Sequence, residues 1–492
     1  MFEKLEFKQF QELTKGYERI AVFQEFSSDL ITPMTAVQAL KKDTNIILLE
    51  SGEVITRDGR FSHIGFEPIA EIASYGFETQ VRKGDQIQIE EGDPFEILRR
   101  MHRDYVCGSY KDLLGFAGGA AGYFAYDAVR YIEDIPDAHL ETREYPDVFF
   151  QFFDRGMTFD HEKKKVLIVR VVERGDDHQK SYKGAMDEIE ELYATITSIQ
   201  PKMRPKRDIQ FNLNEKVKVT PDDQAFREII HKAKEYIRAG DAFQIVPSRR
   251  FEVEIESTPF EIYRSMRYFT PSPFMFYISH PEFAITGASP EKLVSVRGRE
   301  LETIPLAGTR PKGKTPAENA ALAEDLLNDP KEIAEHMMLV DLGRNDLGMV
   351  SKPGTVKVTK LKEVQFFSHV MHIASFIQGE LREELDALDA LKATLPAGTL
   401  SGAPKIRAME IIDELEPVRR GPYGGAICFL DHLGNLGSCI GIRMALIKNG
   451  KAVVQTGMGI VMDSDPEKEL EESVHKARGV LTAIQAAEEG VL

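Results

Sequence analysis

The sequence predicts an α+β protein in which strands and helices alternate without a regular order. Short apolar runs typical of strands occur at residues 45–51, 148–153 and 166–172. Amphipathic helical patterns follow Thr220-Pro221 and Asp465-Pro466, two pairs that resemble helix starts. The chain shows no steady strand–helix–strand rhythm and no internal repeat. With 492 residues, of which 42% are hydrophobic, it can bury large cores.

A basic, proline-containing stretch at residues 199–220 is the best candidate for a boundary between regions. It predicts an N-terminal region over residues 1–200 and a second region over residues 215–492. The N-terminal region mixes apolar strands with a glycine-rich apolar segment at 114–124, which is typical of close backbone packing.

Composition excludes several classes of protein. A net charge of −17 argues against a general nucleic-acid or anionic-membrane surface. Three widely spaced cysteines predict neither a disulfide framework nor a zinc cluster. The charged N-terminus lacks a signal-peptide core, and no apolar run approaches membrane length. These observations predict a cytoplasmic location.

Residues 455–476 place an anion-binding pattern beside a cation-binding pattern. The turn Gly457-Met458-Gly459 lets backbone approach a ligand, and its N–H groups suit an anion. On the following helix Glu469, Glu472 and Lys476 share one face, where two carboxylates can hold a hard cation. The simpler alternative is a hairpin leading into a solvated acidic helix.

Residues 308–315, GTRPKGKT, match the phosphate-binding pattern GxxxxGK[ST]. Pro316 follows where the helix of a phosphate loop should already donate N–H groups. The apolar residues before Asp341 continue a helical pattern, so Asp341 is not a ligand at a strand end. A nucleotide-binding protein is therefore a weak alternative.

Several other residues carry possible chemistry. Glu332 and Glu335 lie one turn apart and favour magnesium, although an ordinary charged helix face is as good an explanation. Glu291, in a tight turn between strands, could serve as a general acid if buried. His372 lies in an apolar stretch, where a core histidine is the commoner role. Arg443, next to an apolar strand, could bind a carboxylate.

Taken together, these motifs closely resemble the chorismate-utilising enzymes, and among them component I of the anthranilate synthases. The resemblance rests on GTRPKG, EIAEHMMLVDLGRND, GTLSGAPKIRAME, GPYGGAI and QTGMGI followed by EESVHKAR. LLES, GRFSHIG and GGAAGYFAYDAVRY extend it into the N-terminal half. It implies a large antiparallel β-sandwich surrounded by helices, with the N-terminal region woven into the same core.

The resemblance also implies roles for individual residues. Glu335 and Glu472 would hold Mg²⁺, with Glu332 and Glu469 as supporting carboxylates. The carboxylates of chorismate would be bound by Gly308, Thr309, Tyr423, Arg443, Gly457, Met458, Gly459 and Lys476. Glu291 would protonate the departing hydroxyl at ring carbon 4, and His372 would assist the loss of pyruvate.

Two positions sort the chain within that group. Gln244 stands where relatives that add water carry a lysine base, so ammonia is the implied nucleophile. Ala307 stands where aminodeoxychorismate synthases typically have a nucleophilic lysine, so amination at carbon 2 is implied. The aminodeoxychorismate branch is the runner-up, and a non-catalytic tryptophan sensor is a further alternative.

The same resemblance implies feedback inhibition by tryptophan at Glu50, Ser51, Pro273, Phe274 and Met275. Thr270 and Phe274 depart from the usual Asn and Tyr, which leaves the strength of inhibition open.

None of the three cysteines lies in the Gly-x-Cys-x-Gly elbow of a glutaminase. Ammonia is therefore expected from a separate glutamine amidotransferase subunit, in a heterodimer or heterotetramer.

Overall fold

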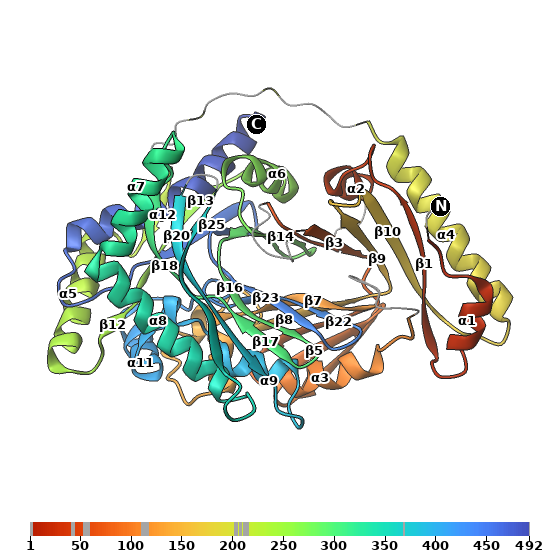
Figure 1. The fold of residues 1–492 in the computed structure, drawn as a ribbon, viewed down its shortest axis with the longest axis horizontal. Helices are drawn as coiled ribbons and strands as arrows, with labels where there is room; N and C mark the ends of the chain where they lie inside the picture. Colours follow the sequence, from red (N-terminus) through yellow and green to blue (C-terminus); the bar gives the residue numbers. More distant parts are fainter. Residues whose placement is uncertain are drawn as a thin grey trace.

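Two large antiparallel sheets form the centre of the molecule (Figure 1). The computed structural model describes residues 3–40, 45–52, 60–109, 118–200, 205, 209, 216–367 and 370–491. The predicted boundary segment therefore lies largely outside the described residues. Across the described helices, no segment has both the length and the apolar character required to span a membrane.

Within the described residues, the first sheet has eleven strands. In spatial order they are β1 (Arg19–Ser27), β10 (Lys165–Glu173), β9 (Arg155–Asp160), β3 (Phe61–Phe66), β2 (Ile46–Glu50), β14 (Phe274–Ser279), β15 (Ala284–Ser289), β24 (Met444–Lys448), β25 (Lys451–Gly457), β13 (Ser248–Glu254) and β11 (Lys218–Thr220). The pairing of β2 with β14 joins the N-terminal region to the second region.

The second sheet has twelve strands in the described chain. In spatial order they are β18 (Leu306–Pro311), β20 (Val370–Glu380), β17 (Glu300–Thr303), β16 (Lys292–Arg297), β23 (Leu436–Ile440), β22 (Ala426–Asp431), β7 (Gly119–Phe124), β8 (Val148–Phe153), β4 (Ala70–Tyr75), β5 (Glu78–Lys83) and β6 (Gln86–Glu91), with β19 (Lys357–Phe366) pairing to β20. Here β7 pairs with β22, so both sheets contain strands from both regions.

The glycine-rich segment shows why β7 is built from small residues. A Cβ atom on Gly122 would lie 1.9 Å from the carbonyl oxygen of Phe149 on β8. No side chain fits there, and glycine permits this close approach.

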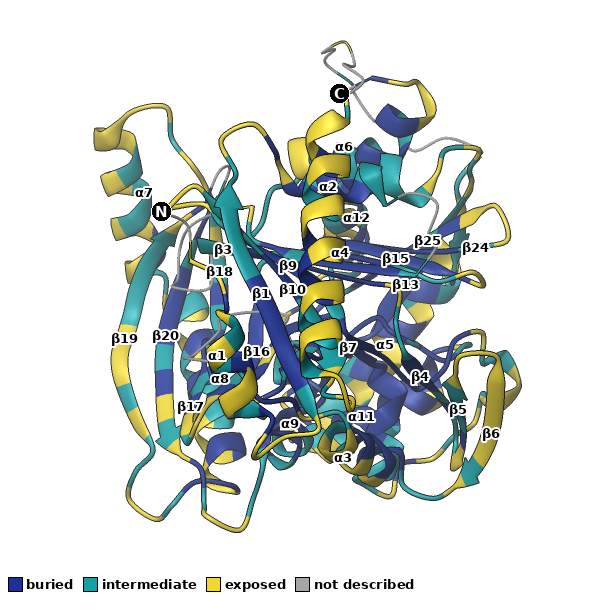
Figure 2. Ribbon diagram, turned by 90° about the vertical axis from the view of Figure 1, so that its right-hand side faces the viewer, coloured by how far each residue is buried: buried dark blue, intermediate teal, exposed yellow. Residues whose placement is uncertain are grey.

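The helices cover the outer faces of the two sheets. They are α1 (Phe7–Leu13), α2 (Pro33–Ala39), α3 (Pro94–Asp104), α4 (His178–Ser198), α5 (Asp223–Ala239), α6 (Pro259–Phe269), α7 (Pro316–Asn328), α8 (Pro330–Gly348), α9 (Ala387–Thr394), α10 (Gly398–Ser401), α11 (Lys405–Leu415) and α12 (Pro466–Glu488), with 3₁₀ turns η2 (Tyr126–Tyr131) and η3 (Leu140–Thr142). A two-stranded sheet pairs β12 (Gln244–Ile245) with β21 (Gly402–Ala403). Figure 2 shows α4 lying across β1 and β10 with its outer side exposed.

Alternation along the strands builds two cores. On β2, Ile47 points into a core shared with Phe149 of the twelve-stranded sheet. Its neighbour Leu48 points the other way, into a core shared with α6 and α12. The predicted fold class is therefore confirmed: an antiparallel sandwich surrounded by helices, with the N-terminal region in the same core.

Of the two predicted helix starts, the one at α5 is wrong and the one at α12 is confirmed. Thr220 is the last residue of β11, and the side chain of Asp222 caps α5 by accepting from the Ala225 N–H (2.9 Å). At α12 the prediction is confirmed, because the Asp465 carboxylate accepts from the Glu467 N–H (2.9 Å).

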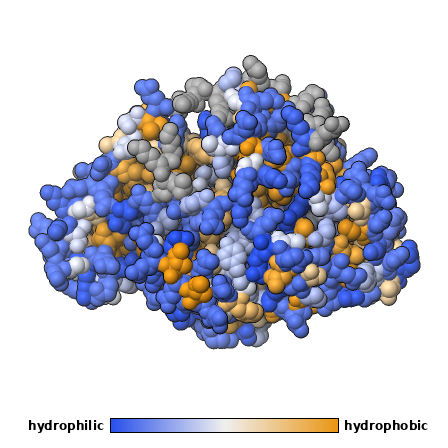
Figure 3. Space-filling model, turned by 180° about the vertical axis from the view of Figure 1, so that it is seen from behind, coloured by the Kyte–Doolittle hydropathy of each residue, from blue (hydrophilic) through white to orange (hydrophobic). Residues whose placement is uncertain are grey.

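The outer surface seen in Figure 3 is mostly hydrophilic, with scattered apolar patches.

Candidate active site

Lys476 on α12 is a charged neighbour of Glu291 and of three of the predicted metal-binding carboxylates. Its Nζ donates to the carbonyl oxygen of Gly457 (2.9 Å) and pairs with Glu472 Oε1 (2.7 Å). Its positive charge also reaches Glu291, Glu335 and Glu469, where it partly offsets the rise in pKa that burial causes. The structure therefore brings together carboxylates from α8, α12 and the β15–β16 turn.

Glu291 lies in the predicted turn between β15 and β16 and is 8% exposed. Burial raises the pKa of its carboxyl to about 8, although Thr399 and the backbone of Leu306 hydrogen-bond to it. The Thr399 hydroxyl donates to Glu291 Oε1 at 3.3 Å. A carboxyl that stays protonated near neutral pH can act as a general acid.

His372 on β20 faces β18. Its Nδ1 lies 2.8 Å from the carbonyl oxygen of Gly308 and 3.2 Å from Thr309 Oγ1. Because a carbonyl only accepts, Nδ1 carries the hydrogen and Nε2 is left as an acceptor. Burial lowers the pKa of His372, which favours the neutral imidazole. This histidine is thus set up to accept a proton at Nε2.

The four predicted metal-binding carboxylates lie in pairs on α8 and α12. Burial and the neighbouring Glu332 raise the pKa of Glu335. Burial and Glu472 raise the pKa of Glu469. This mutual repulsion is what a bound cation would relieve, and carboxylate oxygens are the ligands of Mg²⁺. Within the described residues, however, no three His, Cys, Asp or Glu side chains are gathered closely enough to hold a metal ion.

The two glycines of the 457–459 turn leave space that polar side chains from other segments occupy. A Cβ atom on Gly457 would lie 2.9 Å from the hydroxyl of Tyr423, and one on Gly459 would lie 2.5 Å from Gln244 Nε2. Met458 differs from them: its side chain is in the core, and its N–H donates to the carbonyl of Pro247 (3.1 Å). Its amide is therefore already used within the protein.

Gln244 and Arg443 complete the cluster. Gln244 is buried, and its Nε2 lies 3.5 Å from Glu335 Oε1. Arg443 donates from Nη1 to the backbone carbonyl of Lys476, and burial lowers the pKa of its guanidinium. Tyr423 is also buried, which raises the pKa of its phenol and keeps it a hydrogen-bond donor.

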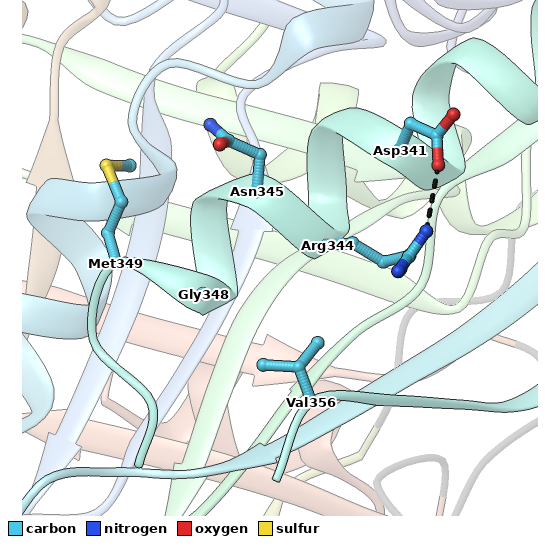
Figure 4. A pocket seen from close by; sticks show the side chains of 6 residues that line it. All are labelled: Asp341, Arg344, Asn345, Gly348, Met349 and Val356. Atoms are coloured by element: carbon cyan, nitrogen blue, oxygen red, sulfur yellow. Dashed lines mark hydrogen bonds and ion pairs between the residues drawn. The ribbon is translucent and has the colours of Figure 1, made fainter. Parts of the chain in front are cut away.

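The segment 308–315 is not a phosphate-binding loop. Gly308 belongs to β18, which pairs antiparallel with β20. The Thr315 hydroxyl caps α7 by accepting from the Glu318 N–H (3.2 Å). Asp341 lies midway along α8, where it pairs with Arg344 (3.1 Å) at the edge of an open groove (Figure 4). A nucleotide site needs the loop to follow a strand, the threonine hydroxyl to be free for a metal ion, and an acidic ligand at a strand end. Gly308, Thr315 and Asp341 meet none of these requirements.

The residues predicted to bind an inhibitor form a second cluster, where β2 pairs with β14. Glu50 is opposite Met275 in the register of that pair. Its carboxylate accepts from the Tyr263 hydroxyl (2.6 Å) and from Arg267. The next turn meets the segment before β14, since the Gly52 N–H donates to the carbonyl of Ser272 (2.9 Å). Ser51, Pro273 and Phe274 lie in these same two segments.

Sequence reasoning missed two residues that hold the site together. Thr399 donates to Glu291, and Arg310 pairs with Glu332 (3.2 Å) and Asp329 (2.9 Å). Thr399 lies in the motif GTLSGAPKIRAME and Arg310 in GTRPKG, but no motif names their partners. Only the spatial contact assigns them a role.

Comparison with known proteins identifies the family of this chain. Residues 45–482 match the family described as chorismate binding enzyme. The chain is 44% identical over 481 residues to anthranilate synthase component 1 of Acetivibrio thermocellus, which covers 97% of each chain. It is 40% identical over 501 residues to the component 1 protein of Acinetobacter calcoaceticus, with 98% of this chain and 99% of that one covered.

Solved structures give the same result. The fold is similar to that of anthranilate synthase component I from Streptococcus pneumoniae TIGR4, with a TM-score of 0.75 and 35% identity over 92% of this chain and 98% of that one. The menaquinone-specific isochorismate synthase of Escherichia coli has a TM-score of 0.71 at 20% identity over 97% and 99% of the two chains, a likeness of fold alone. The chain belongs to the chorismate-binding enzyme family and, within it, to the anthranilate synthase component 1 enzymes.

Proposed function

We propose that this enzyme converts chorismate and ammonia to anthranilate, pyruvate and water, the first committed step of tryptophan biosynthesis. The observation that carries the proposal is the pair of proton-transfer groups at β18. Glu291 interacts with the backbone of Leu306, and His372 with the carbonyl of Gly308 two residues along. One group is a protonated acid near neutral pH, and the other is a neutral base.

Each group serves one step. In the first step ammonia attacks ring carbon 2 while the bond from carbon 4 to its hydroxyl breaks. Glu291 gives the leaving hydroxyl its proton, and water departs. In the second step His372 Nε2 accepts the proton from carbon 2, the bond from carbon 3 to the enolpyruvyl oxygen breaks, and the ring becomes aromatic. The departing enolpyruvate takes up the proton that ammonia lost on addition and becomes pyruvate.

Chorismate carries two carboxylates, and the cluster offers several groups to bind them. Lys476 and Arg443 supply positive charge, and the Tyr423 phenol and the Thr309 hydroxyl supply donors. Gly308, Gly457 and Gly459 allow close backbone approach, whereas the amide of Met458 is already paired. These groups would orient the ring between Glu291 and His372.

Glu335 and Glu472 would hold Mg²⁺, with Glu332 and Glu469 supporting them. A cation held there would supply positive charge to offset the charge of the ring carboxylate. The raised pKa values of Glu335 and Glu469 support this assignment, because a nearby cation would lower the cost of their ionised forms.

Two residues favour ammonia addition at carbon 2. The buried Gln244 amide beside Glu335 cannot deprotonate water. Ala307, paired with Ile373 on the strand that carries His372, offers no nucleophile for the covalent route of the aminodeoxychorismate branch. We infer that ammonia comes from a glutamine amidotransferase subunit, in a heterodimer or heterotetramer in the cytoplasm.

We also infer that tryptophan inhibits the enzyme at Glu50, Ser51, Pro273, Phe274 and Met275. Residues 1–200 would then carry the Glu50–Ser51 half of this regulatory site, and residues 215–492 the chorismate site. Support comes from the paired charges of Glu50 and Arg267, which suit an amino acid ligand.

The test is anthranilate fluorescence from purified protein given chorismate, Mg²⁺ and ammonium salt, with and without tryptophan. A Mg²⁺-dependent signal that tryptophan suppresses supports both reaction and regulation. An aminated product without fluorescence would point to the aminodeoxychorismate branch. Absence of chorismate consumption would overturn the proposal.

A further inference from the structure

Arg420 is a buried cation that bonds to three separate segments. Its side chain is 2% exposed. Nη1 donates to the carbonyl of Leu400 (2.6 Å) and Nη2 to the carbonyl of Val246 (2.6 Å). Nε donates to Glu416 Oε2 (2.9 Å), and Nη2 also reaches the other oxygen of the same carboxylate (2.5 Å). The planar guanidinium fork is thus almost fully used within the protein.

The partners of Arg420 are fixed in turn. Glu416 accepts from the N–H (2.7 Å) and the hydroxyl (2.8 Å) of Ser248. The ring of Tyr126 covers the guanidinium, with its centroid 4.4 Å from the Arg420 Cζ atom. A buried ion pair held by this many hydrogen bonds keeps one geometry, because any displacement leaves a charge uncompensated.

Through Val246, Arg420 fixes the position of the backbone next to Gln244. Val246 lies two residues after Gln244, and its Cγ1 is 3.1 Å from where a Cβ of Gly457 would be. Its own N–H donates to the carbonyl of Ser401 (3.0 Å). The bond from Arg420 therefore fixes the strand that presents Gln244 next to the glycine turn.

Through Leu400, Arg420 also fixes the position of the backbone next to Thr399, the partner of Glu291. Leu400 follows Thr399, whose hydroxyl donates to Glu291. Arg420 itself precedes Gly421, which bonds to η2 through both backbone groups: its N–H donates to Asp127 (2.7 Å) and its carbonyl accepts from Tyr126 (2.9 Å). The loop that ends in Tyr423 is anchored at this point.

We propose that Arg420, with Glu416, is a positioning residue that sets the relative places of Gln244, the Thr399–Glu291 pair and Tyr423. Neither side chain needs to touch the substrate, since their polar atoms are bonded to the protein. The inference rests on the proposed function, because it assigns Arg420 an effect on that reaction.

The test compares Arg420→Lys and Glu416→Gln with Arg407→Lys as the control. Lysine keeps the charge but cannot span the carbonyls of Leu400 and Val246 together. Arg407 is on α11, the helix that ends just before Glu416, but it is 39% exposed and pairs with Asp241 (3.0 Å) at the surface. Chorismate binding by calorimetry, kcat, KM and thermal unfolding are measured for all four proteins.

We expect both test variants to fold and to bind chorismate within about threefold of the parent, with kcat lowered about 10- to 100-fold, as for misplaced catalytic groups. Loss of the Thr399 bond raises the pKa of Glu291, so the basic limb of the kcat profile moves to higher pH. Arg407→Lys should match the parent.

Three outcomes would overturn the inference: an unchanged kcat in both folded variants, an equal loss in the Arg407 control, or a loss of binding without a loss of kcat. If Arg420→Lys fails to fold, Glu416→Gln decides the question, since it keeps the size of the side chain and removes the charge and one of the two acceptor oxygens that hold Arg420. A parent that binds chorismate but makes no anthranilate contradicts the proposed function, whereas an active parent with an unchanged kcat in both folded variants contradicts only the inference about Arg420.

Discussion

Burial determines the protonation state of Glu291 near neutral pH. Water is largely excluded from its carboxyl, and this raises the pKa to about 8 against the opposing effects of Thr399, Leu306 and Lys476. Below that pH the folded enzyme holds the protonated acid, and above it the carboxylate. A reaction that needs the acid should therefore slow as pH rises through about 8.

The substitution Glu291→Gln keeps the shape of this side chain and removes the transferable proton. We expect kcat to fall by about 100- to 10,000-fold, the usual contribution of a general acid. The basic limb near pH 8 should disappear from the residual activity. Anthranilate release is measured across pH 6–10, so that the proton concentration varies about 100-fold on either side of the pKa. Thr399→Ser, which retains the hydroxyl, is the matched control. A variant with parental kcat would rule out Glu291 as the acid.

At the scale of elements, α8 and α12 each contribute a pair of carboxylates one turn apart. Glu472→Gln and Glu335→Gln should keep the fold but weaken Mg²⁺ activation by at least about tenfold, since each removes a charged oxygen ligand. Mg²⁺ titrations of turnover, and of the rise in Tm that the ion causes, measure the effect. Glu467→Gln is the control, because Glu467 is on α12 but pairs with Arg227 at the surface (2.6 Å). Parental Mg²⁺ dependence in both variants would count against the metal assignment.

Local signals predicted these elements well. Asp465-Pro466 predicted the start of α12, and the spacing of Glu469, Glu472 and Lys476 predicted their shared face. The Thr220-Pro221 pair gave a wrong start for α5. Thr220 pairs with β13 as the last residue of β11, and Asp222 caps the helix instead. Short-range patterns cannot weigh such pairings.

Contacts between distant segments could not be predicted from the residues alone. Arg420 contacts Val246, 174 positions away, and Glu50 contacts Arg267, 217 positions away. Neither arginine belongs to a pattern with a known spacing. The arrangement of two sheets with mixed strands came from the resemblance to a family, since alternation gives a strand's faces but not its neighbours.

At the scale of the whole molecule, the proposed regulatory site lies where the two regions join. β2 from the N-terminal region pairs with β14 from the second region, and Glu50 is opposite Met275 there. A ligand at this joint contacts both regions and can favour one arrangement of the shared sheet.

Ser51→Ala or Met275→Ala should therefore raise the tryptophan concentration needed for half inhibition by about tenfold, the effect of losing about 1.4 kcal/mol of binding. Catalysis without tryptophan should stay within about twofold of the parent, because neither residue is among those proposed to bind chorismate, and a loss of binding at a separate site leaves kcat unchanged. Inhibition curves at fixed chorismate measure both quantities. Equal sensitivity to tryptophan in parent and variants would exclude the site.

A polar cluster between the two sheets predicts how the whole fold responds to acid. Glu71 on β4 accepts from Gln151 on β8 (2.9 Å) and lies 3.4 Å from His280, which follows β14 in the other sheet. Burial alone would raise the pKa of Glu71, but the bonds from His280 and Gln151 together lower it below its usual value.

A carboxyl with a lowered pKa in the folded state stabilises the protein above its unfolded value of 4.5, and this stabilisation is lost as pH falls through the folded value. Glu71→Gln should lower the free energy of unfolding at pH 7 by about 1–3 kcal/mol. It should also flatten the fall in Tm below the unfolded pKa, because the ionisation that drives that part of the curve is gone. Glu78→Gln, on the exposed face of β5, should leave the acid limb unchanged. If both variants follow the parental curve, the charge of Glu71 does not link the two sheets.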